Sequence, residues 1–223
     1  MTAGVHAVVF DLDGVLIDSI TVMRQAFDLA YKEVVGKGEA PFEDYLPHLG
    51  RHMPETLRIM GLPADMYPAF VRHSHDLVGE VPQCAGAAAL LAGLRARGPA
   101  LAVATGKTHD RAVHVLAAVG LLDSLDVVVG SDEVPRGKPA PDIVLLALAQ
   151  LGVDPAHAFM VGDSPLDLLA GRAAGTRVAA ALWGQGAEAD LLDCRPELTA
   201  VSCADLASRL HDLPLQAPPR SAR

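Results

Sequence analysis

The sequence is poor in cysteine and in basic residues. Its three cysteines, Cys84, Cys194 and Cys203, form an odd set without C-x-x-C spacing, which argues against a disulfide framework or a zinc site. Lysine and arginine total 18 against 27 acidic residues, so the net charge is −9 and no basic surface is expected that would attract nucleic acid or an anionic membrane. We therefore expect a small molecule as the partner.

Long apolar segments are also missing. The longest apolar runs, near residues 84–94 and 143–149, fall well short of the roughly 20 residues needed to span a bilayer. The first residues contain no basic segment, and acidic residues follow at Asp11 and Asp13, unlike a signal peptide. These features predict a cytoplasmic protein that is a monomer or a homodimer.

Short, continuous apolar runs are abundant, and they are typical of strands buried on both faces of a parallel sheet. The predicted strands are residues 7–10, 100–104, 127–129, 158–161 and 178–182. Helix-like segments alternate with them and are followed by glycines, which commonly end helices: residues 86–97, 109–119, 141–151 and 166–174. The alternation predicts an α/β fold with a doubly wound, Rossmann-like parallel sheet.

One stretch interrupts this alternation. Between residues 16 and 82 the pattern is helical and contains no convincing buried strand, which predicts a helical cap domain inserted after the first strand. Residues 1–15 and 83–213 would then form the Rossmann-like catalytic core. Residues 214–223 are rich in proline, serine and alanine and are expected to be a flexible tail.

Polar residues follow the predicted strands, where the carboxyl ends of parallel strands meet at one edge of the sheet and ligands commonly bind. The set comprises Asp11, Asp13, Gly14, Thr105, Gly106, Lys138, Asp163 and Asp167. Clustered carboxylates repel one another unless a cation lies among them, and Mg²⁺ suits a site of oxygen ligands that also receives a phosphate. The sequence therefore predicts Mg²⁺ together with a phosphoryl group.

Phosphoryl transfer requires a nucleophile, neutralisation of the phosphoryl oxygens and a proton for the leaving group. Asp11 is the candidate nucleophile, which would form an aspartyl phosphate. Asp13 is the candidate acid and base, with a pKa expected to be raised by the neighbouring negative charge. Thr105 and the free amides near it can bind phosphoryl oxygens, and Lys138 adds a positive charge.

The remaining acids are expected to complete the metal site. Asp163 would bind the ion, while Ser164 and Asp167 lie behind it, and Asp167 can orient Lys138 or a metal-bound water. Each residue taken singly has a simpler reading, because an Asp at a strand end is most often a turn former or helix cap. Lys107 is expected to be a surface residue near the phosphate loop.

Four segments resemble, in order and spacing, the motifs of the haloacid dehalogenase-like (HAD) phosphatases. They are residues 10–14 (FDLDG), 104–106 (ATG), 137–142 (GKPAPD) and 161–167 (VGDSPLD). The resemblance extends from about residue 5 to residue 210. It implies Mg²⁺ held by the Asp11 carboxylate, the Asp13 backbone carbonyl and the Asp163 carboxylate. It also implies a mobile helical cap similar to that of the phosphoglycolate phosphatase and β-phosphoglucomutase branch.

The cap is expected to select the substrate, because it closes over the phosphoryl site. In related capped enzymes a glycine-containing loop reaches the active site, which makes Arg51 and His52 candidates for substrate binding, together with Gly106 of the core. Residues 49–52, 59–63 and 103–107 also resemble the phosphatases associated with 3-amino-5-hydroxybenzoate biosynthesis in ansamycin-type antibiotic pathways.

The leading hypothesis is a Mg²⁺-dependent phosphatase that hydrolyses a small phosphate monoester, a sugar phosphate or a phosphoglycolate-like compound. A phosphomutase is the alternative within the family. Met23 stands where the β-phosphoglucomutase branch carries a histidine, and a thioether cannot deliver a proton. A non-catalytic HAD-like binding protein is the alternative from another class, although such proteins commonly lose the nucleophile, the acid or the lysine, all of which this chain retains.

Overall fold

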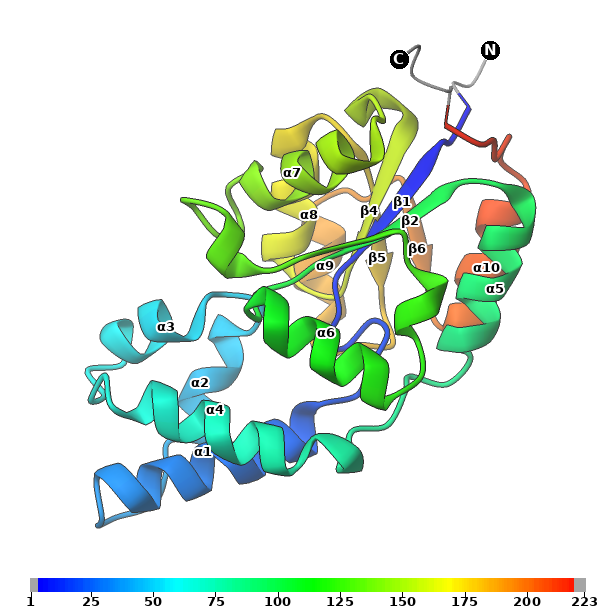
Figure 1. The fold of residues 1–223 in the computed structure, drawn as a ribbon. Helices are drawn as coiled ribbons and strands as arrows, with labels where there is room; N and C mark the ends of the chain where they lie inside the picture. The colour runs from blue at the N-terminus through cyan, green and yellow to red at the C-terminus, as the bar shows by residue number, and fades with distance from the viewer. Residues whose placement is uncertain (1–3, 219–223) are drawn as a thin grey trace.

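The computed structural model describes residues 4–218, and a six-stranded sheet lies at its centre (Figure 1). All neighbouring strands are parallel, and their order is β3-β2-β1-β4-β5-β6. The strands are β1 (Ala7–Phe10), β2 (Ala100–Ala104), β3 (Val127–Val129), β4 (Ala158–Gly162), β5 (Arg177–Ala181) and β6 (Leu198–Ala200). The predicted α/β class with a parallel sheet is confirmed. Strand β6 was not predicted, because its three residues do not form a continuous apolar run.

Helices cover both faces of the sheet. One face packs against α5 (Ala87–Arg97), α6 (His109–Ala118) and α10 (Cys203–His211). The other packs against α7 (Asp142–Leu151), α8 (Pro165–Ala174) and α9 (Glu188–Asp193). Alternate residues of β1 face opposite layers, so Val8 and Phe10 belong to the first apolar core and Val9 to the second. Because both faces are covered, the strands are apolar throughout.

Four further helices leave the sheet after β1 and return before α5 (Figure 1). They are α1 (Ile20–Val34), α2 (Phe42–Tyr45), α3 (Met53–Ile59) and α4 (Met66–Asp76). Phe27, Phe42 and Phe70 form the centre of a third apolar core within these helices. A cap domain at residues 16–82 requires such a separate core. The boundaries of the domains stay a prediction. Single 3₁₀ turns occur at Leu46–His48, Val78–Glu80, Leu122–Ser124, Ser131–Glu133 and Pro155–His157.

The two ends of the described chain lie side by side. The Val5 amide donates a hydrogen bond to the Pro214 carbonyl (2.9 Å), and the Gln216 amide donates to the Val5 carbonyl (2.9 Å). The first residues of the segment predicted as a flexible tail are thus paired with the start of the chain, and residues 219–223 lie outside the described residues. Within residues 4–218, no helix is long and apolar enough to cross a membrane.

Candidate active site

The register of the central strands places three of the predicted site residues at one edge of the sheet. Phe10 of β1 lies beside Val103 of β2 and Val161 of β4, so Asp11, Thr105 and Asp163 emerge within two residues of these positions. The Asp11 amide continues the ladder by donating to the Val161 carbonyl (2.8 Å). All three side chains are buried, and the carboxyl ends of the strands bring together residues that are far apart in the sequence.

Lys138 joins two of the acids. Its Nζ donates to Oδ1 of Asp11 and to Oδ1 of Asp167, at 2.6 Å in each case, and all three side chains are at most 4% exposed. Burial alone would lower the pKa of Lys138, but the charges and hydrogen bonds of the two carboxylates raise it above its usual value. Lys138 is therefore a fixed ammonium ion between Asp11 and Asp167.

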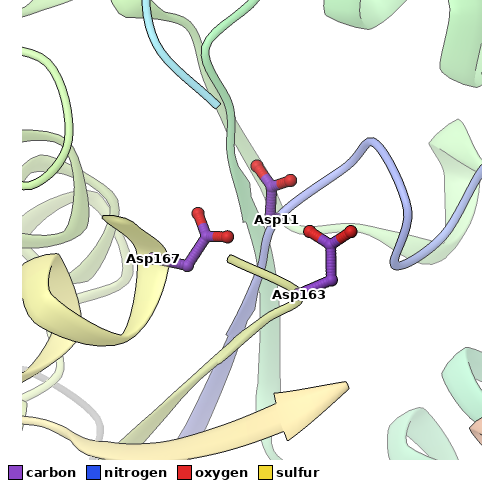
Figure 2. A group of neighbouring side chains, drawn as sticks. All are labelled: Asp11, Asp163 and Asp167. Atoms are coloured by element: carbon purple, nitrogen blue, oxygen red, sulfur yellow. The ribbon is translucent and has the colours of Figure 1, made fainter. Parts of the chain in front are cut away.

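Asp11, Asp163 and Asp167 form a compact carboxylate cluster (Figure 2). Each offers an oxygen within 4.8 Å of the others. Burial, reinforced by Asp167 and Asp13, raises the pKa of Asp11 to about 7 despite the opposing charge of Lys138. Burial and the neighbouring carboxylates also raise the pKa of Asp163 well above its usual value. Such a cluster favours a bound cation, because a cation allows all the carboxylates to ionise together.

Asp167 is already satisfied by protein donors. Its Oδ1 accepts from Lys138, while its Oδ2 accepts from the hydroxyl (2.6 Å) and the amide (3.1 Å) of Ser164. These two residues form a capping box at the start of α8, with Pro165 in its first turn. Because both oxygens of Asp167 are engaged by protein donors, Asp11 and Asp163 are the members of the cluster better placed to bind a metal ion.

Asp13 is paired with Lys107, which the sequence predicts to be a surface residue. The Nζ of Lys107 donates to both oxygens of Asp13 at 2.6 Å, and the Lys107 side chain is only 13% exposed. Ser19 Oγ donates to the same carboxylate. Burial alone would raise the pKa of Asp13, but Lys107 and the hydrogen bond from Ser19 together lower it. The expected raised pKa is therefore wrong for this structure.

Glycines make room for the carboxylates. Gly14 has φ = +77°, and a Cβ at this position would lie 2.0 Å from Oδ2 of Asp163. A Cβ at Gly184 would lie 2.3 Å from the same oxygen, and the Gln185 amide that follows donates to it at 2.8 Å. The loop after β5 thus contributes to the site, although no motif in the sequence pointed to it.

The loop between α2 and α3 covers the phosphate-binding candidates. A Cβ at Gly106 would lie 2.6 Å from the Gly50 carbonyl and 3.0 Å from the Arg51 carbonyl, so the two backbones are in close contact. Thr105 Oγ1 accepts from the Lys107 amide (3.2 Å), and its side chain is fully buried. The glycine at 106 is required for this approach of the cap loop to the core.

Two connected cavities lie in front of Asp11. The larger, about 400 Å³, is lined by Asp11 and Asp163 of the cluster, by apolar side chains of α1 and the cap loop, and by Asp18 and Asp190. The smaller, about 30 Å³, reaches Asp11, Asp13 and Arg51. Arg51, a candidate for substrate binding, thus lines this cavity, and its Nε is buried without a hydrogen-bond partner among the described residues. His52 instead packs edge-on against Tyr67, and burial lowers its pKa.

Comparisons with known proteins agree with this architecture. The model of the haloacid dehalogenase-like hydrolase family matches residues 8–181. Pyrophosphatase PpaX of Bacillus pumilus is 34% identical over 207 residues, which cover 91% of this chain and 94% of that protein. A phosphoglycolate phosphatase of Cupriavidus necator is 34% identical over 80% of this chain and 81% of that protein. A haloacid dehalogenase-like family hydrolase from Streptococcus pneumoniae has the same fold, with a TM-score of 0.82 at 24% identity, covering 92% and 98% of the two chains.

The fold and the strand-edge cluster of acids are those of a hydrolase built on a Rossmann-like parallel sheet. The chain belongs to the haloacid dehalogenase-like hydrolase family, and it is a phosphatase of that family. A divalent metal is general in this family, and the buried acids of this chain are suited to one.

Proposed function

We propose that the protein hydrolyses a small phosphate monoester through an aspartyl phosphate on Asp11, with Mg²⁺ at Asp11 and Asp163. The observation that carries the proposal is the buried contact of Lys138 with Asp11 and Asp167 at the edge of the sheet. This contact fixes one oxygen of the nucleophile and leaves the other free to attack. It also gives a positive charge at the point where phosphoryl oxygens gain negative charge.

The reaction has two steps. In the first, the free oxygen of Asp11 forms a bond to phosphorus while the bond to the leaving oxygen breaks, and Asp13 gives that oxygen a proton. In the second, Asp13 takes a proton from water, whose oxygen attacks phosphorus as the bond to Asp11 breaks. Thr105 and the amides near Gly106 bind the phosphoryl oxygens, and the products are an alcohol and inorganic phosphate.

The donor set fits a divalent metal. Asp11 and Asp163 each offer a carboxylate oxygen, and the glycines at 14 and 184 leave space at Asp163 that a Cβ would fill. The resemblance adds the Asp13 backbone carbonyl, and an all-oxygen set of this kind suits Mg²⁺. When bound, Mg²⁺ would supply positive charge to the phosphoryl oxygens and favour ionised Asp11. Asp167 orients Lys138 through its Oδ1, and Ser164 holds Asp167 in place through its Oδ2.

The larger cavity favours a leaving group without a second negative charge. Among its described lining residues there is no lysine or arginine, while Asp18 and Asp190 line it as acids. A sugar phosphate suits this lining better than pyrophosphate or phosphoglycolate, whose leaving groups are anionic. Arg51, Lys107 and Arg111 line the smaller cavity, which has room for about one water molecule at ~30 Å³ and not for a second phosphate. A role in aminohydroxybenzoate antibiotic biosynthesis, which would use such a sugar phosphate, is part of this proposal.

Hydrolysis is favoured over phosphoryl return to the substrate. Met23 lines both cavities beside Asp13, and its thioether provides neither a proton donor nor a base there. A mutase of this branch uses a histidine at the matching position. The retained Asp11, Asp13 and Lys138 also argue against a non-catalytic binding protein.

The test is hydrolysis of an aryl phosphate and of a panel of sugar phosphates, with Mg²⁺ and with EDTA. Asp11→Asn should reduce turnover by several orders of magnitude while the far-UV circular dichroism spectrum stays unchanged. Asp28→Asn, an exposed change of the same kind on α1, is the matched control. Near-normal turnover of the Asp11→Asn variant, or turnover that EDTA leaves unaffected, would contradict the proposal.

A further inference from the structure

A second large cavity, of about 400 Å³, lies where α4 runs between α1 and α6 (Figure 1). Its lining is mostly apolar and includes Val22 of α1, Phe70 and Val71 of α4, Val78 of the connector that returns to the core, and Val115 of α6. We call it the hinge cavity, because both connecting segments and both parts of the chain contribute to it. None of the clustered acids lines it, so the proposed reaction does not account for it.

Arg111 supplies a cation to the hinge cavity. Its guanidinium lies 5.2 Å from the centre of the Phe70 ring. Within residues 4–218 no carboxylate forms an ion pair with it, whereas the ammonium of Lys107, the neighbouring cation, is held by Asp13. The only acid in the lining, Asp110, is exposed in the first turn of α6, where a helix N-terminus stabilises a carboxylate. Arg111 is therefore free to pair with an anion.

Two histidines lie at the rim of the hinge cavity. His75 of α4 and His114 of α6 stack with their ring centroids 4.3 Å apart, and both are exposed. The stack connects the helical insertion with the core. A ligand in the cavity would likewise contact both parts of the chain.

A narrow gap separates this cavity from the nucleophile. The 30 Å³ cavity that reaches Asp11 shares four lining residues with the hinge cavity, Met23, Phe70, Lys107 and Arg111. At ~30 Å³ per water molecule the gap holds about one water, so a phosphate ester at Asp11 does not extend through it. The hinge cavity therefore takes a ligand other than the reacting ester.

We propose that the hinge cavity binds a small organic carboxylate with an apolar ring or branched chain. The carboxylate pairs with Arg111, and the apolar body packs against Val22, Val71 and Val115. The volume equals about a dozen waters at ~30 Å³ each, which sets the ligand at about a dozen non-hydrogen atoms. A single negative charge suits the site, because a phosphate dianion would leave charge unpaired among apolar side chains. This binding goes beyond the proposed hydrolysis and does not depend on it.

The test is a fluorescence anisotropy titration of 2-naphthoate with the full chain. We expect saturable binding that excess inorganic phosphate with Mg²⁺ does not displace. Binding should weaken about tenfold or more in Arg111→Gln, because a charge-assisted hydrogen bond is lost. The matched control is Arg58→Gln, an exposed arginine of α3 outside the cavity, which should leave affinity unchanged.

A second comparison needs no variant. The neutral analogue 2-naphthalenemethanol should compete with 2-naphthoate about tenfold or more weakly on the unmodified chain. Val71→Trp, which fills the cavity, should also reduce naphthoate binding. Absence of saturable binding, equal affinity of the acid and the alcohol, or displacement by phosphate would each overturn the proposal. Because binding is read without turnover, these results are independent of whether the chain hydrolyses any phosphate ester.

Discussion

Replacing Lys138 by methionine tests the buried charge cluster, because methionine keeps an unbranched apolar side chain and removes the ammonium. Lys138 contacts Asp11 and Asp167 at 2.6 Å, and all three side chains are almost fully buried. Without it, these two acids and Asp163 would be neighbours with no cation. Removing one partner of a buried ion pair typically costs about 3–5 kcal/mol. We expect a loss of this size in the free energy of unfolding at pH 8 in EDTA.

The loss should grow with pH. The pKa of Asp11 is about 7 with Lys138 in place, above the ordinary value of 3.8, and removing the ammonium raises it further. A carboxyl whose pKa is higher in the folded state than in the unfolded state lowers the free energy of unfolding as the pH rises from the unfolded pKa to the folded pKa. Above the folded pKa the loss stays constant. The contribution of Asp11 to the stability of the unmodified chain should therefore fall between about pH 4 and pH 7. That of Lys138→Met should continue to fall above this range, so the two chains differ more at pH 8 than at pH 6.

Urea unfolding followed by far-UV circular dichroism at pH 6 and pH 8 measures both effects. Lys138→Met/Asp167→Asn should recover part of the stability without recovering turnover, because removing both partners leaves fewer unpaired charges. Lys32→Met, an exposed change on α1, is the matched control. A Lys138→Met chain as stable as the unmodified chain at pH 8, or a double variant no more stable than the single one, would refute the reasoning.

Three other outcomes are expected. Lys107→Met should raise the pKa of Asp13, the acid of the first step, which moves the alkaline limb of the pH–turnover profile to higher pH; Lys32→Met should leave the profile in place. Mg²⁺ binding at pH 6 should release at least about one proton, because Asp11 with a pKa of about 7 is mostly protonated there and the pKa of Asp163 is also raised; calorimetry in two buffers of different ionisation enthalpy that shows no proton release would contradict this. Arg51→Ala should change the ratio of turnover between phosphorylated metabolites more than aryl phosphate hydrolysis, and equal losses on both would count against a role in selection.

The parts of the site that could be predicted from the sequence are those fixed by parallel strands. Asp11 and Asp163 follow strands that neighbour each other in the sheet, so their meeting needs only the topology. Lys138 was assigned through its motif, and its contact with Asp11 spans 127 positions in the sequence. The roles of these residues in catalysis stay a prediction, because the structure shows their contacts and not the reaction.

Other features depended on contacts that no local pattern reveals. The local sequence predicts that Lys107 is a solvated lysine after the phosphate loop. In the structure its ammonium instead donates to Asp13, which lies 94 residues earlier in the chain. Ser19 directly precedes α1, a position where serine commonly caps a helix, but its hydroxyl donates to Asp13 and makes no cap hydrogen bond. The sequence places only acids close to Asp13, which would raise its pKa, and does not reveal the contact with Lys107 that lowers it. Gly184 carries no motif, and its importance follows from the space beside Asp163.

The two lysines give the two aspartates of the first motif opposite protonation tendencies. Burial leaves Asp11 with a pKa of about 7 even beside Lys138, whereas Lys107 and Ser19 lower the pKa of Asp13. The first step of the proposed reaction requires the reverse, an ionised Asp11 and a protonated Asp13. The two pKa shifts are therefore opposite to the protonation states that the first step needs. A cation shared by Asp11 and Asp163 would ionise the nucleophile, and separation of Lys107 from Asp13 would let the acid take up its proton.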